Sequence, residues 1–222
     1  MSEGRRLVLW RHGRTAWNVA QRFQGQTDVP LDDVGARQAT RAARVLAATR
    51  PDVIVSSDLA RASSTAMRLG RVTGTEVTYD EGLRERHGGL WQGRTLKEFL
   101  AAHPGQPSWR TPGGDVRPPA GETLAEAGAR AVDTLAKTLA PLPDGATVVA
   151  VTHGATARGV LCALLGLDVA RAGVLGPLAN CAWSVLEESP GGWCLLAHNV
   201  GAVNGGPARD DTPRWAEAPG TT

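Results

Sequence analysis

The sequence predicts an α/β fold: a three-layer sandwich with a mostly parallel central sheet, helices on both of its faces, and a lid insertion. Runs at 7–10, 53–55 and 147–151, apolar except for Thr147, are typical of strands that are buried on both faces. Segments with apolar residues at helical spacing alternate with these runs. One irregular stretch, at about 86–121, is too long for a plain connection, and such stretches are usually functional lids or disordered segments.

The first eighty residues alternate between short apolar runs and helical spacing. We expect, in order, a strand at 7–10, a helical turn at 15–18, a turn-rich loop at 20–32, a helix at 33–49, a strand at 53–55, a helix to about 72 and a weak strand at 76–79. Ser57 or Asp58 is expected to cap the helix that ends near 72, because both side chains accept hydrogen bonds from free helical N–H groups.

The second half continues the same alternation after an irregular stretch. We expect a short helix near 95–102, a helix from the capping box of Thr123 and Glu126 to about 139, a strand at 147–151, a helix to 165, and antiparallel strands at 181–186 and 193–198 joined by a turn at 189–192. Residues 1–200 are expected to form one domain that includes the lid. Residues 201–222, rich in Gly, Pro, Asp and Ala, are expected to be a loose tail.

The composition is that of an ordinary soluble globular protein, with 42% hydrophobic and 21% charged residues. A formal net charge of +2 argues against nucleic acid as a partner. Only Lys97 and Lys137 are lysines among 24 basic residues. Arginine suits phosphate and carboxylate oxygens, although genomic base composition also explains this bias. The chain lacks a P-loop pattern and a Rossmann glycine fingerprint, which disfavours kinases and dehydrogenases.

The cysteines and the N-terminus indicate a cytoplasmic protein. Cys162, Cys181 and Cys194 are odd in number and lack the spacing of metal ligands or of a disulfide framework. We interpret them as small core residues in a reducing compartment. The first residues lack the apolar run of a signal peptide or a membrane span, so no membrane partner is expected.

Polar side chains follow the predicted strands at the points where these end. Arg11 and His12 follow the first strand, Arg61 comes shortly after the second, and His153 follows the strand at 147–151. Glu85 follows the weak strand. Because ligands of open α/β sheets bind outside the carboxyl ends of the strands, we expect these five side chains to surround one crevice.

This set of side chains fits phosphoryl transfer. Arg11 and Arg61 can hold the oxygens of a phosphate dianion, and Arg61 would lie in the first turn of a helix, which also favours anions. His153 can add a third contact. In the transition state the charge spreads over three oxygens, which fixed donors stabilise.

The same set offers a nucleophile and a general acid. His12 can attack phosphorus if one ring nitrogen donates to a backbone carbonyl and leaves the other free. Gly13 is expected to let the backbone approach a ligand closely. Glu85 is the candidate that protonates the leaving alcohol and later takes a proton from water, since a nearby phosphate dianion favours its protonated form.

Six motifs spread over roughly residues 6 to 200 support this chemistry. They are Arg11-His12-Gly13-Arg14-Thr15-Ala16-Trp17-Asn18, Phe23-Gln24-Gly25-Gln26-Thr27-Asp28-Val29-Pro30-Leu31, Ser57-Asp58-Leu59-Ala60-Arg61-Ala62, Leu83-Arg84-Glu85, Gly121-Glu122-Thr123 and Thr152-His153-Gly154. Together they resemble the histidine phosphatase superfamily, also called phosphoglycerate mutase-like, whose fold matches the predicted one.

The resemblance implies a role for each residue of the predicted site. It implies that His12 is the phosphorylated nucleophile and Glu85 the acid and base. It also implies that the phosphate is held by several side chains, namely Arg11, Asn18, Gln24, Arg61 and His153. No metal or other cofactor is expected. Arg14 stands where the family usually has Glu or Gln, which changes the charge at the mouth of the pocket.

Within the family, the chain resembles the phosphatases more than the mutases. Glu85 and His153 are only 68 positions apart, whereas mutases typically carry a longer insertion there. The matches extend to actinobacterial phosphatases that act on glucosyl-3-phosphoglycerate, although other sugar phosphates, phosphoglycerates and phosphoserine remain open. Substrate contacts are expected in or near the lid, from Arg14, Arg22, His87, Trp91, Arg94, Trp109 and Arg110. Alternatively, Trp91 and Trp109 anchor the lid by burial.

Two other classes of function fit these residues less well. A catalytically inactive module that binds phosphorylated ligands would have no need of Glu85. A metallohydrolase that uses the histidines is disfavoured by the lack of an HExxH motif and of short ligand spacing. A homodimer could form through the apolar strand at 181–186 if that strand is a sheet edge.

Overall fold

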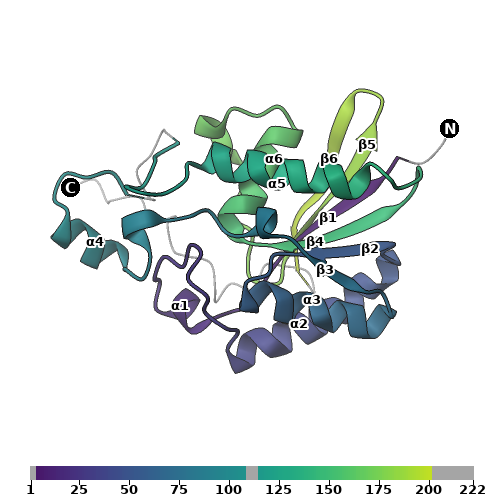
Figure 1. Cartoon of the computed structure of the whole chain (residues 1–222), viewed down its shortest axis with the longest axis horizontal. Helices are drawn as coiled ribbons and strands as arrows, with labels where there is room; N and C mark the ends of the chain where they lie inside the picture. Colours follow the sequence, from purple (N-terminus) through teal and green to yellow (C-terminus); the bar gives the residue numbers. More distant parts are fainter. Residues whose placement is uncertain (1–3, 109–114, 202–222) are drawn as a thin grey trace, which may run out of the picture.

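A single six-stranded sheet organises the computed structural model, which describes residues 4–108 and 115–201 (Figure 1). Its strands are β1 (Arg6–Arg11), β2 (Val53–Ser56), β3 (Val77–Tyr79), β4 (Thr147–Thr152), β5 (Trp183–Ser189) and β6 (Gly192–Val200). Their order across the sheet is β3-β2-β4-β1-β5-β6. The first four strands pair in parallel, whereas β5 runs antiparallel to β1 and β6. The predicted α/β class and mostly parallel sheet are therefore confirmed.

Helices cover both faces of the sheet, as predicted (Figure 1). They are α1 (Ala16–Val19), α2 (Asp33–Leu46), α3 (Ala60–Thr73), α4 (Leu96–Ala102), α5 (Leu124–Leu139) and α6 (Gly154–Leu164), with 3-10 turns η1 (Ala47–Thr49), η2 (Glu81–Leu83), η3 (Gly89–Trp91) and η4 (Val169–Val174). Successive side chains of β1 point to opposite faces. Leu7 and Leu9 pack with α5 and α6, whereas Val8 and Trp10 pack with α2 and α3.

Most predicted caps are present, but the cap of α3 comes from elsewhere. Thr123 and Glu126 form the expected capping box of α5. Neither Ser57 nor Asp58 is the N-cap of α3, which is Leu59. Asp58 instead pairs with Arg84, and Ser57 lies against His153. The N-terminus of α3 is capped by Asp28, whose Oδ1 accepts from Ala60 N at 2.7 Å.

Two expectations about the last strands are wrong. β5 is not a sheet edge, because its backbone pairs with β1 on one side and with β6 on the other. The edges are β3 and β6. The second wrong expectation is that Cys194 is a core residue, because it is exposed on the edge strand β6. Cys162 and Cys181 are buried, as expected. A homodimer stays a prediction, but β5 cannot be the edge through which it forms.

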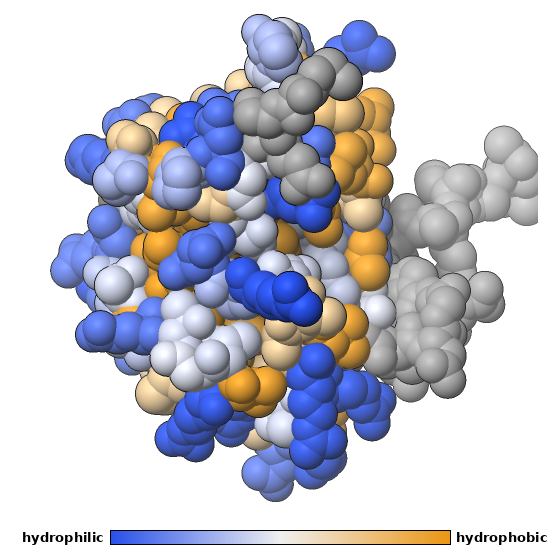
Figure 2. Space-filling model, turned by 90° about the vertical axis from the view of Figure 1, so that its right-hand side faces the viewer, coloured by the Kyte–Doolittle hydropathy of each residue, from blue (hydrophilic) through white to orange (hydrophobic). Residues whose placement is uncertain are grey.

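Two charged pairs lie at the end of the molecule at which β1 begins. Arg5 pairs with Glu188 at 2.6 Å and Arg6 with Glu187 at 2.9 Å. Figure 2 views the molecule from this end, where hydrophilic residues separate the hydrophobic ones into groups. Among the residues described, no helix is both long and apolar enough to cross a membrane.

Candidate active site

The two predicted histidines meet at the carboxyl ends of adjacent strands. β1 and β4 pair in register, so that Arg11 lies opposite Thr152 and the next residues, His12 and His153, become neighbours. Their ring centroids are 5.1 Å apart, and both side chains are buried. The crevice predicted from the strand ends is therefore a real meeting point of the two imidazoles.

The ring of His12 is held in one tautomer. Its Nδ1 lies 2.7 Å from the carbonyl oxygen of Gly13, which can only accept, so Nδ1 carries the proton. Burial, together with the charges of Arg61 and Arg11, lowers the pKa of His12 well below its ordinary value. At neutral pH the ring is therefore uncharged and Nε2 keeps its lone pair, as a nucleophile requires.

Arg61 lies in the first turn of α3 and is fully buried. Its Nη2 and Nη1 donate to the carbonyl oxygens of Gly25 and Thr27, at 2.7 and 2.9 Å. Its Nε donates to Nδ1 of His153 at 3.2 Å. Burial lowers the pKa of Arg61 to about 10, against the charges of Glu85 and Asp28, so the group stays cationic at neutral pH. Two of its five N–H groups remain for an anion.

His153 is fixed in the opposite tautomer. Because Nδ1 accepts from Arg61, the proton of the neutral ring is on Nε2, which lies 2.9 Å from Ser57 Oγ. Burial and the neighbouring charges lower the pKa of His153 well below its ordinary value. In this tautomer the N–H of His153 Nε2 points to Ser57 Oγ, on a ring whose centroid lies 5.1 Å from that of His12.

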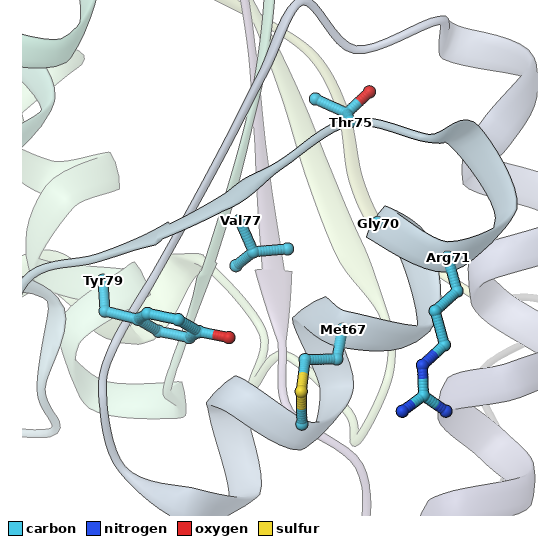
Figure 3. A pocket seen from close by; sticks show the side chains of 6 residues that line it. All are labelled: Met67, Gly70, Arg71, Thr75, Val77 and Tyr79. Carbon is cyan, nitrogen blue, oxygen red and sulfur yellow. The ribbon is translucent and has the colours of Figure 1, made fainter.

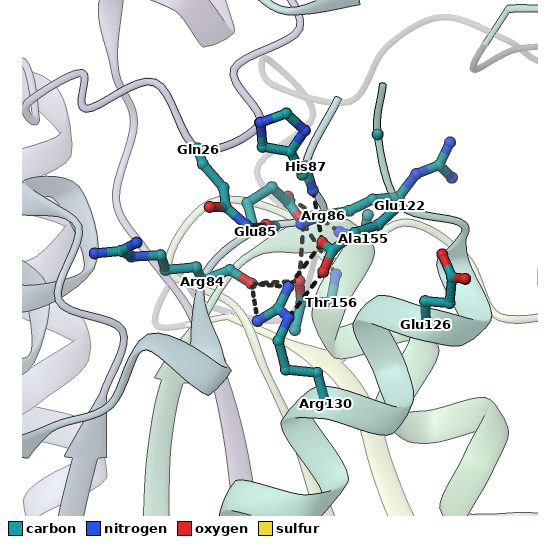
Figure 4. Close-up of polar contacts among 12 residues, drawn as sticks. Gln26, Arg84, Glu85, Arg86, His87, Glu122, Glu126, Arg130, Ala155 and Thr156 are labelled. Atoms are coloured by element: carbon teal, nitrogen blue, oxygen red, sulfur yellow. Dashed lines mark hydrogen bonds and ion pairs between the residues drawn. The ribbon is translucent and has the colours of Figure 1, made fainter. Parts of the chain in front are cut away.

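Glu85 is brought to this site by the N-terminus of α6 (Figure 4). Its Oε1 accepts from the backbone N–H groups of Arg86 (2.8 Å) and Thr156 (3.0 Å), and Thr156 Oγ1 lies 3.1 Å away. Its Oε2 accepts only from Ala155 N, at 3.2 Å, among the described residues. Oε2 is thus the oxygen with room for a proton.

The predicted phosphate ligands Asn18 and Gln24 share a small polar network. Asn18 Oδ1 accepts from Thr15 N at 3.0 Å and from Asn180 Nδ2 at 3.3 Å. The hydroxyl of the buried Thr15 lies 3.0 Å from Gln24 Oε1. Because both amide oxygens accept within the protein, the two amide nitrogens are left as donors for an anion.

Arg11 and Gly13, on either side of His12, have different structural roles. Arg11 Nη1 donates to the carbonyl oxygen of Leu178 at 2.6 Å, which fixes its side chain beside α6. Gly13 was expected to make room for a ligand. A Cβ there would instead lie 2.5 Å from the carbonyl oxygen of Gly35, so this glycine lets the β1 loop pack against α2.

Comparison with known proteins identifies this arrangement. The profile of the histidine phosphatase superfamily (branch 1) matches residues 7–201. The chain belongs to this superfamily. Because the profile covers most of the chain, the resemblance that the sequence motifs carry is confirmed.

Relatives of this histidine phosphatase include phosphatases and probable mutases. A glucosyl-3-phosphoglycerate phosphatase of Mycolicibacterium vanbaalenii is 43% identical over 188 residues, covering 81% of this chain and 82% of the relative. A probable phosphoglycerate mutase of Yersinia enterocolitica is 34% identical over 219 residues, covering 94% and 99%. The solved structure of a mycobacterial glucosyl-3-phosphoglycerate phosphatase in complex with VO3 has a TM-score of 0.82 at 40% identity, covering 88% of this chain and 99% of that one.

The segment 86–108 of this phosphatase packs against the loop after α1. Trp91 is fully buried between Phe23 and Phe99, with ring centroids 5.5 and 6.2 Å away. Gly93 N donates to the carbonyl oxygen of Phe23, and Phe23 N donates to that of Arg94. Trp91 therefore anchors the segment by burial, which was the alternative interpretation of the sequence. In this position its ring cannot stack on a sugar.

The other predicted specificity residues are mostly engaged within the protein. Arg14 pairs with Asp32, and Arg22 with Glu98, at 2.9 and 2.6 Å. Arg94 Nη1 lies 3.1 Å from His103 Nε2. His87 is half-buried beside Glu85 (Figure 4). Trp109 and Arg110 lie outside the described residues, as do residues 202–222 of the tail predicted at 201–222. A substrate contact by Arg14, Arg22, His87 or Arg94 stays a prediction.

A pocket of about 280 Å³ lies away from this site, between α3 and β3 (Figure 3). It is lined by Met67, Gly70, Arg71, Thr75, Val77 and Tyr79. No predicted catalytic residue is among them, so the chemistry does not belong to this pocket. Within residues 4–108 and 115–201, no group of three or more His, Cys, Asp or Glu is placed to hold a metal ion.

Several residues that shape the site were not predicted from the sequence to be site residues. Ser57 faces His153, Asn180 holds Asn18, and Thr156 lies against Glu85. Asn180 Nδ2 also donates to the carbonyl oxygen of His12, at 3.1 Å. The signal for Thr156 was its place three residues after His153, at the helix N-terminus that follows β4. Asn180, which precedes β5, was not predicted to be a site residue.

Proposed function

We propose that this histidine phosphatase hydrolyses a small phosphomonoester through a covalent phosphohistidine on His12. The observation that carries the proposal is the 2.7 Å contact between His12 Nδ1 and the carbonyl oxygen of Gly13. It assigns the lone pair to Nε2 of a neutral, buried ring that lies 5.1 Å from the ring of His153 and close to the Arg61 charge. A binding module would not need a nucleophile prepared in this way.

In the first step, His12 Nε2 attacks phosphorus while the bond from phosphorus to the ester oxygen breaks. Glu85 gives its proton from Oε2 to the departing oxygen, so that an alcohol leaves. The arginines Arg11 and Arg61, with His153, stabilise the charge on the transferring group. The amides of Asn18 and Gln24 contribute donors to the same phosphate.

In the second step, a water oxygen attacks phosphorus and the bond from phosphorus to His12 Nε2 breaks. Glu85, left as a carboxylate by the first step, takes a proton from this water. The products are inorganic phosphate and the regenerated neutral His12. These steps need no metal ion, so we expect full activity after treatment with a chelator.

Glucosyl-3-phosphoglycerate is the substrate that we propose, acted on in the cytoplasm. Support comes from relatives of 42–43% identity that carry the name glucosyl-3-phosphoglycerate phosphatase. The relatives named as probable phosphoglycerate mutases reach 33–35% identity. Mutase activity is therefore the second candidate, because a phosphohistidine can also return its phosphoryl group to a second hydroxyl.

Rapid-quench labelling and a product assay separate these candidates. We expect an acid-labile phosphate on wild-type protein, absent from His12→Ala, and release of inorganic phosphate from glucosyl-3-phosphoglycerate. Interconversion of 2- and 3-phosphoglycerate with little phosphate release would favour the mutase. Tight binding of phosphate without turnover of p-nitrophenyl phosphate would favour an inactive binding module and reject the proposal.

A further inference from the structure

The segment 84–87, which carries Glu85, is held from two sides, and Figure 4 shows the side of Arg130 and Glu122. On one side, Arg84 makes a bidentate ion pair with Asp58, at the carboxyl end of β2. On the other side, the ion pair of Arg130 and Glu122 contacts the backbone on either side of Glu85. The pair of Arg130 and Glu122 is not part of the phosphate site described above, so its geometry points to a different role.

Arg130, on α5, uses its whole guanidinium group. Its Nε and Nη2 donate to the two carboxylate oxygens of Glu122, at 3.0 and 2.9 Å. Its Nη1 donates to the carbonyl oxygens of Gly82 (2.7 Å) and Glu81 (3.2 Å). Both Nη1 and Nη2 reach the carbonyl oxygen of Arg84, the residue before Glu85, at 3.3 Å.

Glu122 completes the contact on the far side of Glu85. Its Oε2 accepts from His87 N at 2.8 Å, and its backbone N donates to the carbonyl oxygen of His87 at 2.9 Å. Burial raises the pKa of Glu122, but the bonds from Arg130 and His87 N outweigh it and hold this pKa below its ordinary value. The ion pair is therefore charged at neutral pH.

We propose that Arg130 and Glu122 are positioning residues for proton transfer by Glu85. This inference rests on the proposed function. Arg130 fixes the backbone before Glu85 and Glu122 fixes it after, while the N-terminus of α6 fixes the carboxylate itself. With both ends of the segment held, Oε2 stays directed at the place where the leaving oxygen departs.

Positioning matters for proton transfer more than for phosphate binding. A donor that is displaced by about 1 Å can lose a large part of its effect on rate. Arg11, Arg61 and His153 are held by contacts other than the ion pair of Arg130 and Glu122. Loss of this pair should therefore slow substrates whose leaving group needs a proton and spare those whose leaving group does not.

The test is Arg130→Lys, which keeps a charge but cannot hold Glu122 and three carbonyl oxygens together. The rate of phosphohistidine formation is measured by rapid quench with two substrates. β-Glycerophosphate has a poor leaving group, and p-nitrophenyl phosphate has a good one. We expect about a tenfold loss with the first and less than about a twofold change with the second. Glu122→Gln should show the same split to a smaller extent.

Arg5→Lys is the matched control. Arg5 also makes a bidentate pair with a glutamate, Glu188, and donates to the carbonyl oxygen of Leu139, but it lies at the opposite end of the sheet. It should change neither rate. Equal slowing of both substrates in Arg130→Lys and Glu122→Gln, or no change in either, would overturn the positioning role. Absence of phosphohistidine in the wild type would instead reject the proposed function, and the positioning role with it.

Discussion

Arg61 Nε donates to His153 Nδ1 over 3.2 Å, and this bond decides which nitrogen of His153 carries the proton. The same guanidinium holds the carbonyl oxygens of Gly25 and Thr27. Arg61 thus joins the start of α3, the end of β4 and the loop that contains Gln24. An arginine in this place orders the neighbouring donors as well as supplying charge.

We predict that Arg61→Lys lowers kcat/KM for p-nitrophenyl phosphate by about 10²–10³. Lysine keeps a charge but has no planar fork, so it cannot hold two carbonyl oxygens and His153 at once. Arg68→Lys is the control, because Arg68 is on the same helix and, within the described part of the chain, donates to the carbonyl oxygens of Ala36 and Ser64 and to no residue of the site. If Arg61→Lys were as active as this control, Arg61 would have no part in organising the site.

Glu85→Gln should reveal its role through the leaving group. Glutamine has the size of glutamate but no acidic proton, so alkyl phosphates should lose about 10²–10⁴ in the rate of phosphohistidine formation. p-Nitrophenyl phosphate, which leaves as a stable anion, should form the phosphohistidine almost as fast as in the wild type. The measurement is a single-turnover rapid quench. Equal losses for both substrates would remove Glu85 from the acid role.

The sheet and the main site residues could be predicted because they depend on local patterns. Apolar runs marked β1, β2 and β4, and the residues after a buried parallel strand necessarily lie at the carboxyl edge. His12 and His153 were therefore expected to meet, although 141 positions separate them. The capping box of Thr123 and Glu126 was likewise readable from spacing alone.

Features that depend on contacts across the chain could not be predicted. Ser57 was a reasonable cap for α3, but the fold places His153 beside it and Asp28 at the free helix end. Gly13 was assigned to ligand approach, and only the packing of α2 shows that Gly35 is what it faces. In each case the residue contacts a partner that is distant in the sequence, and local sequence spacing carries no information about that partner.

The two buried histidines should couple stability to pH. Both have a folded-state pKa well below the ordinary value, so the unfolded chain binds more protons as the pH falls through about 6.5. Stability is therefore complete above that pH and decreases below it, by up to about 1.4 kcal/mol per pH unit for each histidine. Urea unfolding at pH 7.5, 6.5 and 5.5 measures this slope.

His12→Asn should have a smaller pH slope than the wild type, because one of the two groups is gone. Its stability at pH 7.5 serves as its own reference, which separates the slope from any loss of packing. An unchanged slope in this variant would show that His12 binds a proton equally well in the folded and unfolded chain. That result would contradict the claim that His12 is a neutral nucleophile with a lowered pKa in the folded protein.

The crossing of α5 and α6 gives a last prediction, which concerns Gly159. A Cβ at this position would lie 2.7 Å from the carbonyl oxygen of Leu124 and 2.8 Å from Gly128 Cα. Both neighbours are backbone, so Gly159→Ala must push the helices apart and should cost about 1–3 kcal/mol in the free energy of unfolding. The gain in helix propensity from alanine offsets at most about 1 kcal/mol.

The displacement should also reach the site, since the N-terminus of α6 holds Glu85 through Ala155 N and Thr156 N. Gly173→Ala is the control, because no atom of the described residues lies within 4 Å of a Cβ there, and it should stay within about 0.5 kcal/mol of the wild type. Urea denaturation compares the two variants. If Gly159→Ala were as stable as Gly173→Ala, the helices would have room to separate, and their close contact would not be what holds α6 in place.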